Sequence, residues 1–151
     1  RAVYEEVGSR LGQANALRGL GEVARMRGEY EQAASAYAQA RAVYEEVGSR
    51  LGQANALRGL GEVARMRGEY EQAASAYAQA RALHEEIGNR IGQANVFLAL
   101  ARLAETQERC ANACESYAAA QKLYQAIGLG RWAQHCQHAR NRLACSEGPG
   151  D

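Results

Sequence analysis

The sequence predicts an all-α fold, an α-solenoid of tandem helix-turn-helix hairpins. Residues 1–40 and 41–80 are the same string, and residues 81–120 follow it with substitutions. A fixed period of 20 to 50 residues is typical of repeat arrays, in which each unit packs on its neighbours. Within each copy, apolar or small residues recur every three or four positions in two stretches, which predicts two amphipathic helices.

Each unit is expected to hold a helix A and a helix B, at about residues 10–27 and 29–47 in the first copy. Gly28 follows the first helix, where a left-handed residue commonly ends a helix. Each helix B is then separated from the next helix A by a glycine and a side chain that can cap open amide groups. These pairs are Gly8–Ser9, Gly48–Ser49 and Gly88–Asn89.

We therefore expect a single array over residues 1–145. Its parts are a partial helix B at 1–8, hairpins at 9–48, 49–88 and 89–128, a capping helix at 130–145, and a disordered tail at 146–151. The capping helix has an apolar stripe of Trp132, Cys136, Ala139 and Leu143. No cap precedes the first helix A, so Leu11, Leu17 and Leu20 should be partly uncovered. Because the chain begins inside a repeat, this edge is expected to stack either on another copy or on repeats upstream.

Composition excludes several classes of partner. The net charge of +1 gives no attraction toward nucleic acid or an anionic membrane. No apolar run reaches the roughly 20 residues that a membrane span needs. The four cysteines all lie in the last part of the chain, at positions 110, 114, 136 and 145. A disulfide framework is usually spread over a small secreted domain, so free thiols and a cytoplasmic location are the simpler expectation.

The repeated residues resemble the tetratricopeptide repeat. The matching positions are Leu17, Leu20-Gly21, Ala24, Gly28-Glu29-Tyr30, Ala33, Tyr37 and Ala40. The resemblance implies a right-handed solenoid, a non-enzymatic protein-interaction scaffold, and helix A on the concave surface. The 40-residue period is longer than usual and is similar to arrays of kinesin light chains and signalling ATPases. In the third copy Glu108 and Cys110 replace Gly28 and Tyr30, which leaves the shape of that turn open.

The polar stripe of helix A is the predicted partner-binding surface. It comprises Asn15, Arg18, Glu22 and Arg25, then Asn55, Arg58, Glu62 and Arg65, then Asn95, Leu98, Arg102 and Glu105. One interpretation is a solvated face with weak Arg–Glu pairs. The other is a groove for a protein or peptide of mixed or acidic charge, in which arginines engage carboxylates by forked hydrogen bonds. Gly19 and Gly59 would then lie in the groove floor, open to a ligand backbone.

Other candidate sites are better explained by packing, and no cofactor is expected. Cys110, Cys114 and Cys136, with His135 and His138, are residue types that bind zinc. However, Cys110 and Cys114 replace template residues at packing positions. His84 replaces Tyr44 and should be a partly exposed packing residue. No catalytic or phosphate-binding motif is present. Besides a scaffold, the alternatives are a sensor arm of a signalling ATPase, an RNA-binding repeat, and a consensus-like array without a dedicated ligand.

Overall fold

A computed structural model describes the backbone of residues 2–145 and the side chains of residues 5–145. The described residues form seven helices and no strand. The helices are α1 (Ala2–Met26), α2 (Tyr30–Val47), α3 (Arg50–Met66), α4 (Tyr70–Glu86), α5 (Arg90–Thr106), α6 (Cys110–Ala126) and α7 (Gly130–Arg142). The chain divides into two compact units, residues 1–88 and 89–151. The tail expected at 146–151 lies outside the described residues.

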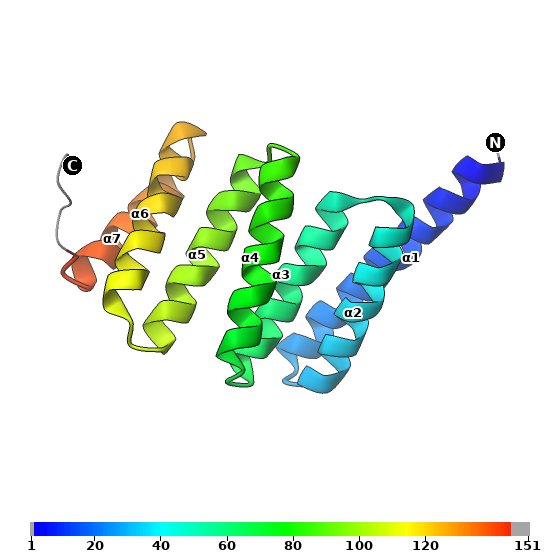
Figure 1. Ribbon diagram of the computed structural model, residues 1–151, viewed down its shortest axis with the longest axis horizontal. Coiled ribbons are helices and arrows are strands. Elements are labelled where there is room, and N and C mark those ends of the chain that lie inside the picture. Colours follow the sequence, from blue (N-terminus) through cyan, green and yellow to red (C-terminus); the bar gives the residue numbers. More distant parts are fainter. Residues whose placement is uncertain (1, 146–151) are drawn as a thin grey trace. The chain divides into compact units, whose positions relative to one another are not determined.

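In both units each helix packs on its sequence neighbour. The first unit holds the hairpins α1–α2 and α3–α4, with α2 also packed on α3, and the second holds α5–α6 followed by α7 (Figure 1). The all-α fold of helical hairpins is thus confirmed. None of the described helices has both the length and the apolar character to cross a membrane.

The expected stop and cap signals operate between the hairpins. Gly48 takes a left-handed conformation, with φ of 74°, at the end of α2. The Ser49 hydroxyl then accepts a hydrogen bond from the Gly52 amide at 3.1 Å, and the Asn89 side chain does the same for Gly92 at 3.0 Å. These bonds satisfy amide groups that the first turn of a helix leaves open.

The turn of the third hairpin keeps the shape of the other two, although it lacks their glycine. Glu108 adopts φ of 58° where Gly28 has 74°. The amide of Arg109 donates to the carbonyl of Ala104 at 2.8 Å, as Glu29 donates to Ala24 at 2.9 Å. A side chain in this left-handed conformation costs about 1–2 kcal/mol. The packing of α5 on α6 therefore holds a conformation that the local sequence disfavours.

The predicted break at Gly8–Ser9 is wrong. α1 runs without interruption from Ala2 to Met26, so residues 1–8 are not a separate end of a helix B. The side chains of residues 5–9 are all exposed, whereas Val43 and Tyr44 just before Gly48 are buried. The local signals are identical at the two sites. Only packing turns the chain at Gly48, and without it the helix simply continues.

Tyrosine rings pack against glycines of the neighbouring helices. The ring of Tyr37 in α2 lies so close to α3 that a Cβ added at Gly59 would meet it at 2.4 Å. The same ring lies against Gly21 of α1, where an added Cβ would meet it at 3.0 Å. Tyr44 occupies the corresponding place over Gly52. These glycines are therefore required because each leaves room for a ring between two helix backbones.

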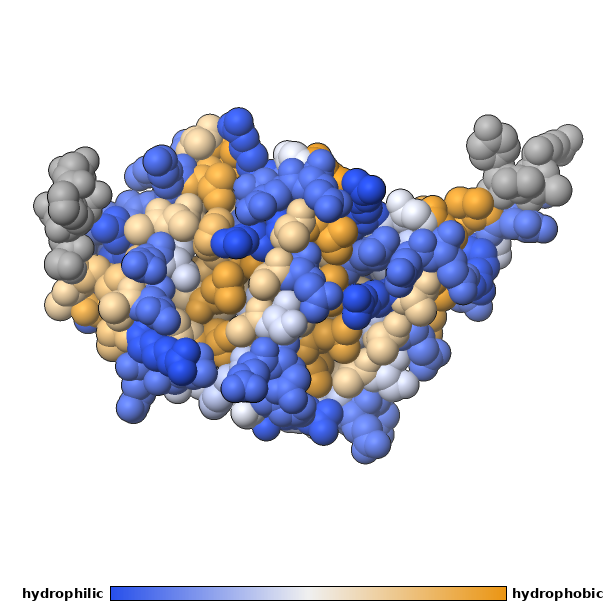
Figure 2. Space-filling view, in the orientation of Figure 1, coloured by the Kyte–Doolittle hydropathy of each residue, from blue (hydrophilic) through white to orange (hydrophobic). Residues whose placement is uncertain are grey.

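The uncovered first edge predicted from the sequence is confirmed. Leu20 is 62% exposed and Val23 is 48% exposed, while Val63, the copy of Val23, is 2% exposed. Leu11 and Leu17 are half-buried. Hydrophobic atoms also reach the surface in the N-terminal part of the chain in Figure 2. Identical side chains therefore have different environments, because α2 covers α3 and no described helix covers this face of α1.

The capping helix α7 forms, but one residue of its predicted stripe is misplaced. Cys136 and Ala139 are buried as expected, and Leu143 packs against the same core. Trp132 is instead 47% exposed, and Ala133 takes the buried position. The indole stacks on the ring of Tyr124 with centroids 5.9 Å apart. A large ring at the first turn of α7 thus covers the edge of α6 from outside.

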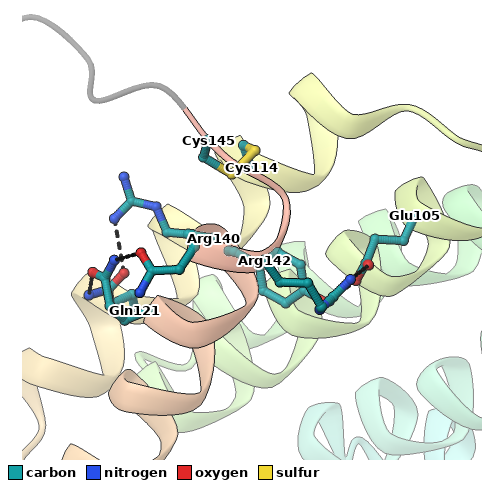
Figure 3. Close-up of a disulfide and its surroundings, with 9 residues drawn as sticks. Glu105, Cys114, Gln121, Arg140, Arg142 and Cys145 are labelled. Atoms are coloured by element: carbon teal, nitrogen blue, oxygen red, sulfur yellow. Dashed lines mark hydrogen bonds and ion pairs between the residues drawn. A yellow bond between two sulfur atoms is a disulfide. The ribbon is translucent and has the colours of Figure 1, made fainter.

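A disulfide ties the end of α7 back to α6, contrary to the expectation of free thiols. Cys114 and Cys145 are bonded across a separation of 31 residues, with Cα atoms 5.7 Å apart (Figure 3). Closing a loop of this length stabilises a fold by about 3–4 kcal/mol in the chain-entropy model. Cys110 and Cys136 remain free thiols, the first exposed and the second buried. The sequence missed this bond because its two cysteines are far apart along the chain.

The two glycines at equivalent places in the first two copies should respond oppositely to alanine. Gly19→Ala should stabilise the protein by about 1 kcal/mol, because helix propensity rises and nothing lies within 4 Å of the new Cβ. Gly59→Ala should destabilise it by about 1–3 kcal/mol, because the Cβ overlaps Tyr37. Urea unfolding of both variants checks this, and equal shifts would contradict the packing described.

Glu108→Gly should stabilise the second unit by about 1 kcal/mol, because glycine adopts the left-handed conformation without strain. Gln107→Gly is the matched control. Gln107 has φ of −88°, so glycine there relieves nothing and should be neutral or destabilising. Thermal unfolding of the two variants would separate relief of strain from a general effect of glycine.

Candidate functional site

The first unit contains a polar pocket of about 200 Å³ between α1 and α3. It is lined by Arg18, Glu22, Arg25, Tyr37, Asn55, Arg58, Gly59 and Glu62. Six of these are predicted binding residues from the first two copies. The equal spacing of the repeats brings them together, because α1 and α3 present the same helical face to one cavity. Three arginines and two glutamates leave the lining with one net positive charge.

Two arginines of this pocket have no ionic partner. Arg18 is half-buried and Arg58 is exposed. Neither forms an ion pair or a side-chain hydrogen bond with another described residue. Arg25 differs, because the neighbouring Tyr37 hydroxyl is the main cause that raises the pKa of its guanidinium. Arg18 and Arg58 are thus the cations of the pocket that remain open to a ligand.

Glu62 and Arg65 are instead engaged inside the hairpin. Glu62 accepts hydrogen bonds from Arg65 at 2.9 Å and from the Tyr77 hydroxyl at 2.7 Å. Burial raises the pKa of Glu62, but the bonds from Arg65 and Tyr77 outweigh it and hold the pKa below its usual value. Burial, followed by the Glu62 charge, raises the pKa of Tyr77 well above its usual value. These predicted binding residues therefore serve first to satisfy a buried hydroxyl.

In the second unit the charges of this pair are exchanged, and the tyrosine still finds a carboxylate. Glu105 stands where Arg65 does, and it accepts hydrogen bonds from the Tyr117 hydroxyl and, at 2.7 Å, from Arg142 of α7 (Figure 3). The bond from Arg142 is the main reason why the pKa of Glu105 lies below its usual value. Burial, then the bond to Glu105, raises the pKa of Tyr117 to about 12. Arg102 and Glu105 line a second cavity of about 360 Å³, which Arg142 and Tyr117 share.

The remaining predicted binding residues are largely structural. Asn15 accepts a hydrogen bond from the Tyr44 hydroxyl, and Asn95 accepts one from Tyr124 at 2.6 Å. Leu98 is 5% exposed and belongs to the core of the second unit. Gly59 is buried beneath the Tyr37 ring, so the expectation that it leaves a groove floor open to a ligand backbone is wrong. Sequence periodicity could not reveal this, because the ring comes from the preceding hairpin.

His84 is buried rather than partly exposed, with 2% of its surface accessible. It stands where the other copies have Tyr44 and Tyr124. Burial lowers its pKa, and the positive charge of Arg58 lowers it further. A smaller ring with a polar nitrogen therefore sits close to an arginine of the pocket, and its surroundings favour the neutral imidazole.

The candidate zinc ligands are not assembled into a site. Cys114 is committed to the disulfide, and burial raises the pKa of the Cys136 thiol to about 11, which disfavours the thiolate that binds metal. Among residues that the structure describes, no group of three or more His, Cys, Asp or Glu side chains is close enough to hold a metal ion. His135 contacts Trp132 by an edge-on ring contact instead.

Comparison with known proteins decides the family. The model of the tetratricopeptide repeat matches residues 1–46 and 12–86, which together cover more than half of the chain. The chain belongs to the tetratricopeptide repeat family. Repeats of this family generally mediate protein–protein interactions. A comparison with curated proteins finds no match.

A solved structure supports the same fold. The crystal structure of BtubC (BKLC) from P. vanneervenii matches with a TM-score of 0.58 and 16% sequence identity, over 91% of this chain and 66% of that chain. At this identity the likeness concerns the fold alone, and the chain spans slightly less than two thirds of that protein. The family match in sequence and the similarity in backbone structure thus agree on the fold.

His84→Tyr should remove a pH dependence of stability. The pKa of His84 is lowered in the folded state from 6.5, so the unfolded chain binds a proton more readily. Stability from this residue is present above about pH 6.5 and falls as the pH drops below it, until the folded histidine also protonates. Urea unfolding between neutral and mildly acidic pH checks this. A wild-type slope no steeper than that of the tyrosine variant would contradict it.

Proposed function

We propose that the pocket between α1 and α3 binds a carboxylate-bearing segment of a partner protein, with Arg18 and Arg58 as its anchors. The observation that carries the proposal is the contrast within one cavity. Glu62 is hydrogen-bonded to Arg65 and Tyr77, and Arg25 lies beside the Tyr37 hydroxyl, whereas Arg18 and Arg58 have no such partner among the described residues. A carboxylate placed between them would balance the single net positive charge of the lining.

Guanidinium groups suit this task because their planar donors form two parallel hydrogen bonds to one carboxylate. Asn55 is half-buried beside them and offers an amide that can donate to, or accept from, a peptide backbone. The floor is the Tyr37 hydroxyl, whose position is fixed by Gly21 and Gly59. Two cations thus stand over a polar base, an arrangement that favours a short acidic segment over an extended apolar helix.

The proposed pocket differs from the second cavity in one respect that bears on selectivity. There the arginine of α7, Arg142, is already paired with Glu105, and Leu98 replaces the first anchor and is buried. The second cavity therefore lacks a pair of open arginines. If the pocket of the first unit binds acidic segments, the second unit should contribute little to that binding.

Binding is tested with a labelled short peptide rich in Asp and Glu. Arg18→Ala and Arg58→Ala should each weaken its affinity by about tenfold or more, because a hydrogen bond to a charged group is worth about 1.5–3 kcal/mol. Arg58→Lys should restore only part of the loss, since lysine keeps the charge but not the forked geometry. Fluorescence anisotropy at physiological salt measures these affinities.

The matched control is Arg27→Ala, which removes the same charge from an exposed position outside the pocket. It should leave the affinity within a factor of about two, as salt screens distant exposed charges. A second control peptide carries Asn and Gln in place of the acidic residues and should not bind. Equal losses for Arg27→Ala and Arg58→Ala would show nonspecific attraction and would sink the proposal, as would no binding at all.

A further inference from the structure

We infer that the open face of α1 binds a helix with the chemistry of α2, supplied by another protein. The open face comprises Gly12, Ala16, Gly19, Leu20 and Val23. The partner helix carries two tyrosines seven residues apart, separated by small residues, as Tyr37 and Tyr44 are in α2. This surface does not include the pocket anchors Arg18 and Arg58, and its proposed occupancy does not depend on that pocket binding a peptide.

The corresponding face of the next copy is covered by a helix. Gly52, Ala56, Gly59, Leu60 and Val63 of α3 are identical in sequence to the open face of α1. In α3 this face is covered by α2. Ala56 is fully buried in a cluster with Ala40, Val43 and Tyr44, and Val63 and Leu60 pack with Ala33 and Tyr37.

The open face of α1 keeps the same features, but no described helix occupies it. A Cβ added at Gly12 or Gly19 would meet nothing within 4 Å, whereas at Gly52 and Gly59 it would overlap the rings of Tyr44 and Tyr37. Ala16 is exposed where Ala56 is fully buried. Leu20 and Val23 are about half or more exposed on a helix that is long and regular. Apolar surface of this kind on a soluble fold commonly marks an interaction site.

The recesses at Gly12 and Gly19 determine which kind of helix fits the open face. Each glycine leaves a recess one side chain deep, and the two recesses are seven residues apart, which is two helical turns. Tyrosines at the same spacing fill both recesses, as the contacts of α2 with α3 demonstrate. A helix with alanine at these places would leave the recesses empty, and one with leucine would fill them poorly. Atoms that line such voids lose van der Waals contacts. The recesses thus select aromatic residues at a fixed spacing.

A second copy of the chain is not expected to supply this helix. α2 already uses Tyr37 against both α1 and α3, so a second copy of the chain cannot lend this helix without opening its own hairpin. In α6, Tyr117 and Tyr124 lie within the core formed with α5 and α7. The occupant is therefore a helix of the same type carried by another protein, and exchange between copies is an outcome that the experiment separates.

The test uses a labelled synthetic peptide with the sequence of residues 29–47 and the intact chain. Saturable binding is expected. Gly19→Leu in the chain should weaken it at least tenfold, because the leucine fills the recess that a tyrosine would enter. The same variant should fold normally, since a Cβ at this position meets nothing within 4 Å and leucine raises helix propensity. Circular dichroism and thermal unfolding verify that the fold is kept.

Two further variants make the result decisive. A peptide with Tyr37→Ala should lose at least tenfold in affinity, and Gly12→Leu in the chain should weaken binding as Gly19→Leu does. If the peptide instead displaces α2 from α3, Gly19→Leu will not change its affinity, and the inference is overturned. Absence of binding overturns it too. Self-association in sedimentation analysis that Gly19→Leu abolishes would identify a second copy as the occupant and contradict the partner assigned.

Discussion

The contact on which the first unit depends is a tyrosine ring held between two glycines of neighbouring helices. Tyr37 lies against Gly21 of its own hairpin and Gly59 of the next, so one side chain sets the separation of α1, α2 and α3. A glycine inside a helix costs about 1 kcal/mol relative to alanine. The cost is offset because the backbones approach around a buried ring, and a single substitution at Gly59 would act on all three helices.

The same contact explains what the sequence could predict and what it could not. The helices and most turns follow from periodicity and caps, since Ser49 and Asn89 act within a few residues of their partners. The continuation of α1 through Gly8 does not, because the identical string ends a helix at Gly48. A sequence repeat specifies what each copy can do. The packing around each copy decides which of those conformations it adopts.

The candidate site was predictable as a surface but not as a list of ligands. Spacing predicted Arg18 and Arg58 in one row across neighbouring hairpins, and both line the pocket between α1 and α3. It could not show that Glu62 accepts a hydrogen bond from the Tyr77 hydroxyl. Nor could it show that Glu105 accepts one from Tyr117 in the copy where Glu and Arg exchange positions. A buried hydroxyl needs a partner, and an acid at either of two positions one helical turn apart supplies it. The charged residues of the polar stripe thus partly reflect a structural requirement, although their pattern is that of a binding surface.

Pocket and open face are related through the tyrosine that joins neighbouring hairpins. Tyr37 enters the pocket only because its ring fills the recess at Gly59, where its hydroxyl meets Arg25 beside Arg58. Gly19 and Arg18 repeat Gly59 and Arg58 one copy earlier, but no described ring reaches Gly19. A helix docked there through a matching tyrosine would bring a hydroxyl next to Arg18 and build the base of another such pocket. Adding a hairpin to this edge would therefore extend both the core and the polar surface. The ring of the added tyrosine would complete the core, and its hydroxyl would form the floor of the new pocket.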